Sequence, residues 1–129
     1  MAPMTPFEFG DVVLVPFPFT DQSTTKQRPA VVISSTAYNR DRPDVLILRN
    51  QQPRTIRRHH RGASIVGWQA AGLLTPSFLK PLIATIERPI LRRRLGRLRH
   101  DDQQTLRRLL DQIIGGPNPT TGSRRGASA

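Results

Sequence analysis

The chain has 129 residues, a length that suits one domain with a single core and is short for two. It carries 20 basic and 9 acidic residues, a formal net charge of +11, and only two of the basic residues, Lys26 and Lys80, are lysine. The lack of cysteine excludes disulfides and thiolate metal sites. No apolar run is long enough to span a bilayer and no signal-peptide pattern occurs, so we expect a cytoplasmic protein without a membrane segment.

The excess of arginine indicates an anionic partner. A planar guanidinium matches phosphate oxygens better than an ammonium group does, which favours nucleic acid over an anionic membrane surface. A GC-rich genome also enriches arginine, but it would scatter the residues. Residues 49–61 hold five arginines and residues 88–99 hold six, without an acidic residue in either stretch, which favours a phosphate-binding track.

The first half of the chain is predicted to form three short strands. Residues 1–8 are a lead-in, and the β-branched and aromatic run after them predicts a strand at 11–17, followed by the polar loop of a hairpin. The uniformly apolar residues 29–34 predict a strand that is buried on both faces. A polar connection then leads to a third strand at 45–48.

The second half gives weaker strand signals. Residues 63–66 and 80–87 predict strands, residues 67–72 predict one helical turn, and the arginine-rich residues 88–98 favour a strand and a turn over a helix.

The clearest element is a helix that ends near residue 114. Its apolar residues recur at intervals of three and four: Leu106, Leu109, Leu110, Ile113 and Ile114. Asp101 and Asp102 stand in its expected first turn, and Gly115 follows its end. We expect its apolar stripe to pack on the sheet. Residues 115–129 have almost nothing to bury and are predicted to be a disordered tail.

These elements predict a mainly β domain of the α+β class that spans residues 9–114. About five short strands with no helices between them favour an antiparallel sheet or a partly closed small barrel, with one amphipathic helix at the C-terminal side.

Arg28 stands directly before the most apolar strand. The proline that follows it, Pro29, restricts Arg28 to extended conformations, so its guanidinium should be held at the start of the strand and aimed off the end of the sheet. Such a fixed cation suits a phosphate group. A solvated charge at a strand end would give the same pattern.

Several ordered pieces of the sequence resemble the MazF/PemK family of toxin endoribonucleases. GDVVLVPFPFTD, QRPAVVISS and YNR match, in that order, the first strand, the R-P-A strand and the Y-N pair of the family. GWQAAGLLTPSFLKPLIATIERPILRRRLGRL is similar to the downstream half of a PemK-like subgroup. The resemblance is nearly continuous from Phe9 to Ile114, and several ordered pieces are more specific than any one of them.

The resemblance implies an SH3-like small antiparallel β-barrel with a C-terminal helix. It also implies a homodimeric toxin of a type II toxin-antitoxin system that cuts single-stranded RNA without a metal or other cofactor and is neutralised by an acidic antitoxin. Arg28 matches the catalytic arginine of the family. A preorganised guanidinium there would stabilise the phosphorane that forms when the RNA 2′-OH attacks the adjacent phosphorus.

The chain departs from the family at its second active-site residue, a threonine or serine after the third strand. Gln51 occupies that position, and its amide can donate a hydrogen bond to phosphate but cannot act as a base. Two alternatives to a ribonuclease therefore stay open. One is a member of the same fold that binds RNA or antitoxin without cutting. The other is a protein-targeting toxin similar to a gyrase poison, whose resemblance does not include the R-P-A motif.

Further RNA-binding candidates lie in two polar loops. Their side chains can contact phosphate, 2′-OH or base edges: Thr20, Asp21, Thr25 and Lys26 in the first loop, and Gln52, Arg57, Arg58, His59 and His60 in the second. Imidazole is the usual general base near neutral pH, but adjacent histidines in an extended segment point to opposite sides. The two histidines lack the spacing and the third ligand of a zinc site, so no metal is predicted. Solvated loop residues are the alternative for both sets.

Overall fold

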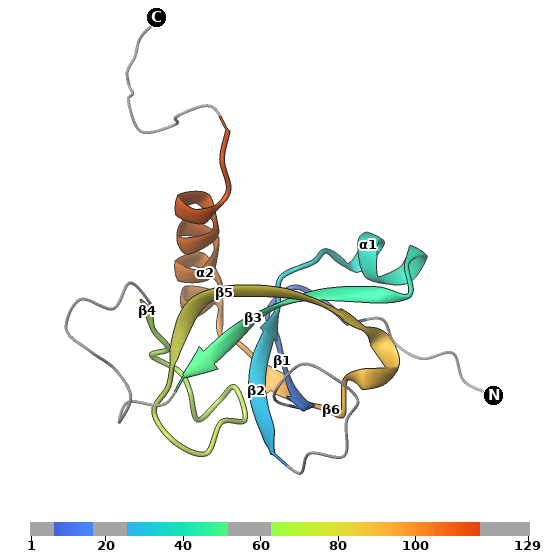
Figure 1. The fold of residues 1–129 in the computed structure, drawn as a ribbon. Helices are drawn as coiled ribbons and strands as arrows, with labels where there is room; N and C mark the ends of the chain where they lie inside the picture. The colour runs from blue at the N-terminus through green and yellow to red at the C-terminus, as the bar shows by residue number, and fades with distance from the viewer. Residues whose placement is uncertain (1–6, 17–25, 52–62, 117–129) are drawn as a thin grey trace, which may run out of the picture.

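The computed structural model describes residues 7–16, 26–51 and 63–116. In this part of the chain six antiparallel strands form one sheet in the order β4-β5-β3-β2-β1-β6 (Figure 1). The strands are β1 (Asp11–Pro16), β2 (Gln27–Val32), β3 (Asp44–Gln51), β4 (Ala63–Ser64), β5 (Phe78–Glu87) and β6 (Arg93–Arg97). The helical elements are α1 (Thr36–Asp41), the 3-10 helix η2 (Arg88–Ile90) and α2 (His100–Ile113).

The sheet curls into a half-barrel. β5 pairs with β3, whereas β6, the next strand in the chain, pairs with β1 on the other side of the sheet. The connection through η2 therefore passes across one face of the sheet, and Leu91, just after η2, is buried against that face. This arrangement confirms the predicted fold class, a small antiparallel barrel-like sheet with a C-terminal helix.

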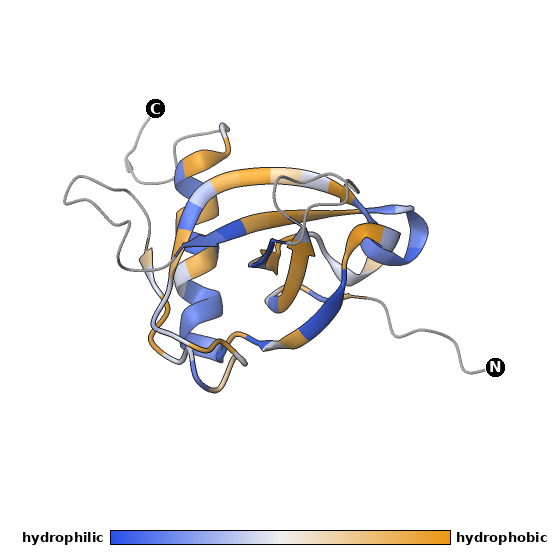
Figure 2. Cartoon of the chain, turned by 60° about the horizontal axis from the view of Figure 1, so that its bottom comes forward, coloured by the Kyte–Doolittle hydropathy of each residue, from blue (hydrophilic) through white to orange (hydrophobic). Residues whose placement is uncertain are grey.

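Two apolar cores lie on the two faces of the sheet, because side chains alternate along each strand. The first core cluster consists of Val12, Val31, Leu48, Ile65, Ala71, Leu73, Leu79, Leu98, Leu106 and Leu109. The second core cluster consists of Val13, Val15, Ala30, Val32, Val45, Ile47, Ile86 and Leu91. Successive residues of β2 alternate between the clusters, which confirms that this strand is buried on both faces. The apolar runs of the strands and of one side of α2 are visible in Figure 2.

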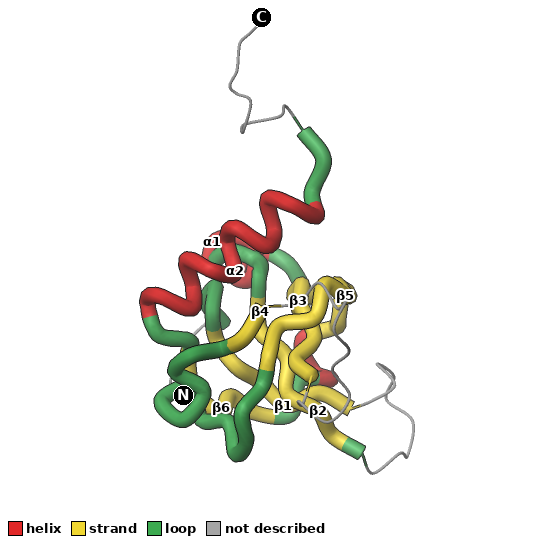
Figure 3. The backbone as a smooth tube through the Cα atoms, turned by 90° about the vertical axis from the view of Figure 1, so that its left-hand side faces the viewer, coloured by secondary structure: helices red, strands yellow, loops and turns green. Residues whose placement is uncertain are grey.

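α2 covers the first core cluster through Leu106 and Leu109, and it lies beside β4 and β5 (Figure 3). The segment after β4 also closes on this face. A Cβ atom on Gly72 would lie 2.3 Å from the carbonyl oxygen of Leu95, and one on Gly96 would lie 2.4 Å from that of Ala71. Because only glycine lets two backbones approach so closely, this segment packs directly on β6 and extends the wall of the half-barrel.

Two expectations about helices were wrong. The polar connection after β2 contains α1, which is capped by Ser35, whose Oγ accepts a hydrogen bond from the N–H of Tyr38 at 3.1 Å. The apolar stripe of α2 does not pack along its whole length, since Ile113 and Ile114 are 37% and 61% exposed. The helix extends past the core at this end.

None of the helices in the described ranges is long and apolar enough to cross a membrane.

Candidate functional site: an arginine pair at the open end of the sheet

Arg28 lies inside the sheet rather than at its entrance. β2 begins one residue earlier, at Gln27, and Arg28 is opposite Val15 of β1 with its side chain half-buried. Residues opposite each other share a face, so Arg28 lies on the face of the second core cluster, to which Val15 belongs. Pro29 has no N–H to donate, and the pairing of β2 with β3 begins only at the next residue, Ala30.

Arg49 of β3 is the second cation on this face. It is opposite Ala30, which makes it the diagonal neighbour of Arg28 across the β2-β3 pair, at the roughly 7 Å that is typical of such neighbours. Arg49 is half-buried, and burial, followed by the positive charge of Arg28, lowers the pKa of Arg49 from its usual value. The structure therefore places two guanidinium groups side by side at one end of the apolar face.

Gln51, the last residue of β3, completes this end of the sheet. Extending the β2-β3 register by two residues places Gln51 across from Arg28, and on its other side Gln51 is opposite Phe78 of β5. The two positions that the sequence identified as catalytic therefore come together. The side chain of Gln51 is half-buried.

This arrangement is suited to binding a phosphate group. The two planar guanidinium groups can donate several hydrogen bonds to one anion. Val15 and Ala30 are the apolar neighbours of these arginines on the same face of the sheet. Partial burial lowers the local dielectric constant, which strengthens the attraction between a guanidinium and a developing negative charge.

One of the other predicted RNA contacts lies within the described residues. Lys26 is exposed and directly precedes β2. The remaining candidates lie outside the described residues: Thr20, Asp21, Thr25, Gln52, Arg57, Arg58, His59 and His60. Their segments, 17–25 and 52–62, connect to the ends of β1, β2 and β3 that carry the arginine pair.

The basic stretch 88–99 is less cationic in space than in sequence. Arg97 Nε donates to Asp11 Oδ1 at 2.8 Å, a hydrogen bond that raises the pKa of Arg97, and Arg94 Nη1 lies 3.5 Å from Asp11 Oδ2. Arg88 donates to the backbone carbonyls of Asn39 and Arg42. The expectation of a track without acidic neighbours was therefore wrong for part of this stretch, because Asp11 of β1 contacts it.

The opposite end of β2 carries a hydrogen-bond network of buried neutral side chains. Asn39 is fully buried, donates to the carbonyls of Phe7 (2.6 Å) and Ser34 (3.2 Å), and accepts from Ser34 Oγ (2.5 Å). Ser34 Oγ in turn accepts from the N–H of Leu46 at 3.1 Å. The asparagine of the Y-N pair therefore joins the lead-in, α1 and β3, which is a structural role.

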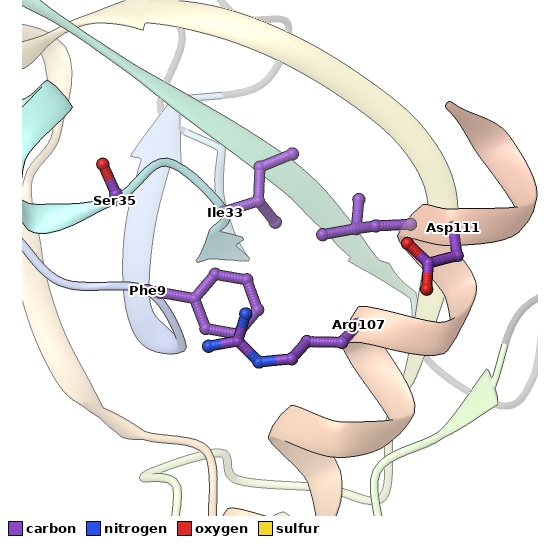
Figure 4. A pocket seen from close by; sticks show the side chains of 6 residues that line it. Phe9, Ile33, Ser35, Arg107 and Asp111 are labelled. Atoms are coloured by element: carbon purple, nitrogen blue, oxygen red, sulfur yellow. The ribbon is translucent and has the colours of Figure 1, made fainter. Parts of the chain in front are cut away.

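A separate pocket of about 480 Å³ lies between α2 and the end of β2 (Figure 4). Arg107 lies over the ring of Phe9, 4.1 Å from its centroid, and Asp111 is on the next turn of α2. Ile33 and Ser35 line the opposite wall. No site residue predicted from the sequence is among the described residues that line this pocket.

Arg49 is the site residue that the sequence analysis missed. It was counted only as the first arginine of a basic loop, because the third strand was predicted to end at residue 48. The alternation of side chains along a strand could have placed Arg49. Val45, Ile47 and Arg49 occupy every second position of β3, and Val45 and Ile47 belong to the second core cluster, so Arg49 lies on the same face of the sheet. To predict that Arg49 lies close to Arg28, one must also know the pairing register of β2 and β3, which cannot be read from the sequence.

The chain is a small antiparallel half-barrel with a C-terminal helix, and two neighbouring arginines lie at one end of its sheet. The family model described as "PemK-like, MazF-like toxin of type II toxin-antitoxin system" matches residues 8–114. The chain belongs to this family, which confirms the resemblance found in the sequence. Comparison with curated protein sequences gives no match.

Two solved structures from Mycobacterial species share the fold. An endoribonuclease in complex with its cognate antitoxin is 20% identical with a TM-score of 0.67, over 90% of this chain and 100% of that chain. An endoribonuclease from Mycobacterial species is 21% identical with a TM-score of 0.68, over 90% of this chain and 98% of that chain.

Proposed function

We propose that this protein is the toxin of a type II toxin-antitoxin system and a metal-independent endoribonuclease that cuts single-stranded RNA, including messenger RNA, at specific sequences. The observation that carries the proposal is the pairing of Arg28 and Arg49 on one face of the sheet. The family and the activity named for the two structural neighbours support it.

In the proposed reaction the RNA 2′-oxygen attacks the adjacent phosphorus and the bond from phosphorus to the 5′-oxygen breaks. The leaving 5′-oxygen takes up a proton from the solvent, so the products are a 2′,3′-cyclic phosphate and a 5′-hydroxyl group. Arg28 stabilises the negative charge that gathers on the phosphorane, and Arg49 binds a second non-bridging oxygen. Gln51 donates an amide hydrogen bond to the same phosphate.

The base that removes the 2′-OH proton is another residue. Guanidinium groups stay protonated in proteins, and an amide does not take up a proton at neutral pH. The candidates are His59, His60 and the carboxylate of Asp21, and they lie outside the described residues.

The partners follow from charge and from the neighbours. The net charge of +11 suits an acidic antitoxin, and one neighbour is in complex with its cognate antitoxin. A homodimer in the cytoplasm is the proposed working form, and two large apolar side chains at the surface, Val66 (78% exposed) and Leu74 (93% exposed), are candidates for its interface.

The test is to incubate the purified protein with a long unstructured RNA in excess chelator and to map the fragment ends. The protein should cut at defined sites and leave 5′-hydroxyl ends. Arg28→Ala should cut about 10²- to 10³-fold more slowly, and Arg28→Lys should recover only part of the rate, because an ammonium group lacks the planar fork. Thermal unfolding should show that both variants are folded at the temperature of the assay.

A specific observation favours a second function. Gln51 replaces the hydroxyl residue of the family, so the same fold and arginine pair would serve a protein that binds RNA or antitoxin without cutting. Intact RNA that stays bound by the wild-type protein at low salt would establish this function. Growth arrest without RNA cleavage or RNA binding would instead indicate a protein target.

A further inference from the structure

Asn50, near the end of β3, is a buried amide in apolar surroundings. The residue is 4% exposed, and neither its amide nitrogen nor its amide oxygen has a hydrogen-bond partner among the residues that the structure describes. On β5 it is opposite Leu79, a member of the first core cluster, so its side chain lies on the face that α2 covers. An unpaired buried amide costs stability, and such a group in a folded protein calls for an explanation.

Asn39 provides the comparison. It is also buried, but its amide donates to the carbonyls of Phe7 and Ser34 and accepts from Ser34 Oγ. These contacts explain why an asparagine stands at position 39. Asn50 makes no such contact with the described part of the chain, so maintaining the fold does not explain the amide at position 50.

The pairing of β3 with β5 is irregular beside Asn50. Leu48 is opposite Ile83 and Asn50 is opposite Leu79, so residues 80–82 of β5 lie across from the single residue Arg49. Bulges of this kind recur next to functional sites, where they change the direction of a side chain. The irregular strand end is therefore a second feature that is typical of a binding site.

A pocket of about 250 Å³ lies on the same face as Asn50. Arg93 of β6 is opposite Leu14 of β1, Leu14 is opposite Pro29 of β2, and all three residues line the pocket. Extending the β2-β3 register by one residue places Asn50 across from Pro29. Asn50 and Arg93 are therefore the two ends of one row of side chains that crosses the pocket's face of the sheet.

The pocket combines apolar walls with a cation. Leu73 and Leu95 add to the apolar wall of Leu14 and Pro29, whereas Arg93 is exposed and forms no ion pair with any residue that the structure describes. Apolar walls suit a base, and a side-chain amide can donate to one atom of a base edge while it accepts from another. A carboxylate of an acidic polypeptide has no donor for the amide oxygen, so this chemistry favours a nucleotide.

We propose that this pocket binds one nucleotide of the RNA and that Asn50 recognises its base. The amide of Asn50 donates one hydrogen bond to the base edge and accepts another, and Arg93 binds the phosphate. Neighbouring side chains shift to admit the base, because the amide is covered in the free protein. The inference rests on the proposed function. Arg28 and Arg49 lie on the opposite face, so the pocket reads a nucleotide away from the cleaved bond and acts in sequence specificity.

The first measurement is thermal unfolding of two matched variants. Asn50→Leu replaces an unpaired amide with an apolar side chain in an apolar cluster, so it should raise the melting temperature. Asn39→Leu makes the same substitution where the amide is paired, and it should lower the melting temperature. Opposite signs would show that Asn50 is retained at a cost to stability.

The second measurement is binding, separated from cleavage. Single-stranded 2′-O-methyl RNA has no 2′-OH to attack, so the full-length protein can be compared on four oligomers, each built from one base. Asn50→Leu should bind the oligomer that the wild-type protein prefers about ten- to a hundredfold more weakly, and the other three nearly unchanged.

The phosphate contact has a different signature. Arg93→Gln should weaken the binding of all four oligomers and reduce the slope of log K against log[salt] by about 0.7, the value for one phosphate contact on a single strand. Arg108→Gln is the matched control, because Arg108 is exposed on α2, where it donates to Thr105 of the same helix at 3.2 Å. It should leave the affinities and the slope near those of the parent protein.

A melting temperature of Asn50→Leu at or below that of the wild-type protein would overturn the inference, because the amide would then be structural. An unchanged preference among the four oligomers would also overturn it. Weaker binding of poly-L-glutamate with unchanged RNA binding would assign the pocket to an acidic polypeptide instead. A wild-type protein that shows the expected variant effects but cuts no unmodified RNA would remove the proposed cleavage and leave the pocket in place. Failure of the wild-type protein to bind any oligomer would remove both.

Discussion

The two ends of β2 are built in opposite ways. At the end next to α1, Asn39 and Ser34 are buried and neutral, and their side-chain polar atoms are joined in one hydrogen-bond network. At the other end, Arg28 and Arg49 place two positive charges side by side on a partly apolar face. A paired neutral network stabilises a fold, whereas adjacent like charges cost stability. This difference fits the proposal that one end maintains the structure and the other end binds an anion.

The largest effect on folding is expected at the neutral end. Asn39→Ala should lower the free energy of unfolding by about 3 kcal/mol, because it leaves Ser34 Oγ and two backbone carbonyls buried without their partner and opens a cavity. Urea unfolding measures the change. Arg40→Ala, at an exposed position of the same helix, is the control and should change stability little.

The comparison also requires that Asn39→Ala leave the chemistry intact. The cleavage rate per folded molecule should match that of the parent protein below the unfolding transition. If Asn39→Ala kept its full stability, Asn39 would not maintain the fold. If the variant lost activity while folded, the Asn39 end would contribute to cleavage as well as to stability.

At the charged end we expect a substitution to change the cleavage rate more than the stability. Arg49→Gln should slow RNA cleavage by about ten- to a hundredfold, because one of two charge-assisted contacts to the phosphate is lost. Its stability should change little. Burial and the positive charge of Arg28 lower the pKa of Arg49 and make the charged form less favourable in the folded state, and removing this cost offsets the loss of the contacts that the guanidinium makes.

Rate assays and thermal unfolding of the same samples check both parts of this prediction. Arg108→Gln removes the same charge from an exposed site on α2 and should change neither quantity. A large loss of stability in Arg49→Gln would mean that this arginine holds the sheet together, and an unchanged rate would remove it from the site.

The sequence predicted the fold well where local patterns decide it. The uniformly apolar run of β2 and the helical spacing of Leu106 and Leu109 were enough to place the core. α1 was missed because it has six residues and is stabilised by its cap at Ser35 and by the buried contacts of Asn39. Such a short helix depends on tertiary partners that a local pattern does not contain.

The site was predicted only in part for a related reason. Arg28 is marked by its place before an apolar strand, but Arg49 joins it through the register of two strands. The same limit applies to the basic stretch 88–99, where Arg97 is paired with Asp11, which is 86 residues away in the chain. Charge counted along a sequence therefore overestimates the charge that is available in space.

The smallest predicted effect concerns a surface pair at the α1 end. Arg42 Nε donates to Asp44 Oδ1 at 3.1 Å, and this hydrogen bond lowers the pKa of Asp44. The pair therefore adds stability above the ordinary pKa of an aspartate, and that stability is lost as the pH falls through the lowered pKa of Asp44. Because the pair lies at the surface, its contribution should be far smaller than that of Asn39. An NMR titration of the Asp44 carboxyl checks the direction, and the pKa should return toward its ordinary value in Arg42→Ala. An Asp44 pKa that did not move in that variant would show that the backbone around β3, rather than Arg42, sets it.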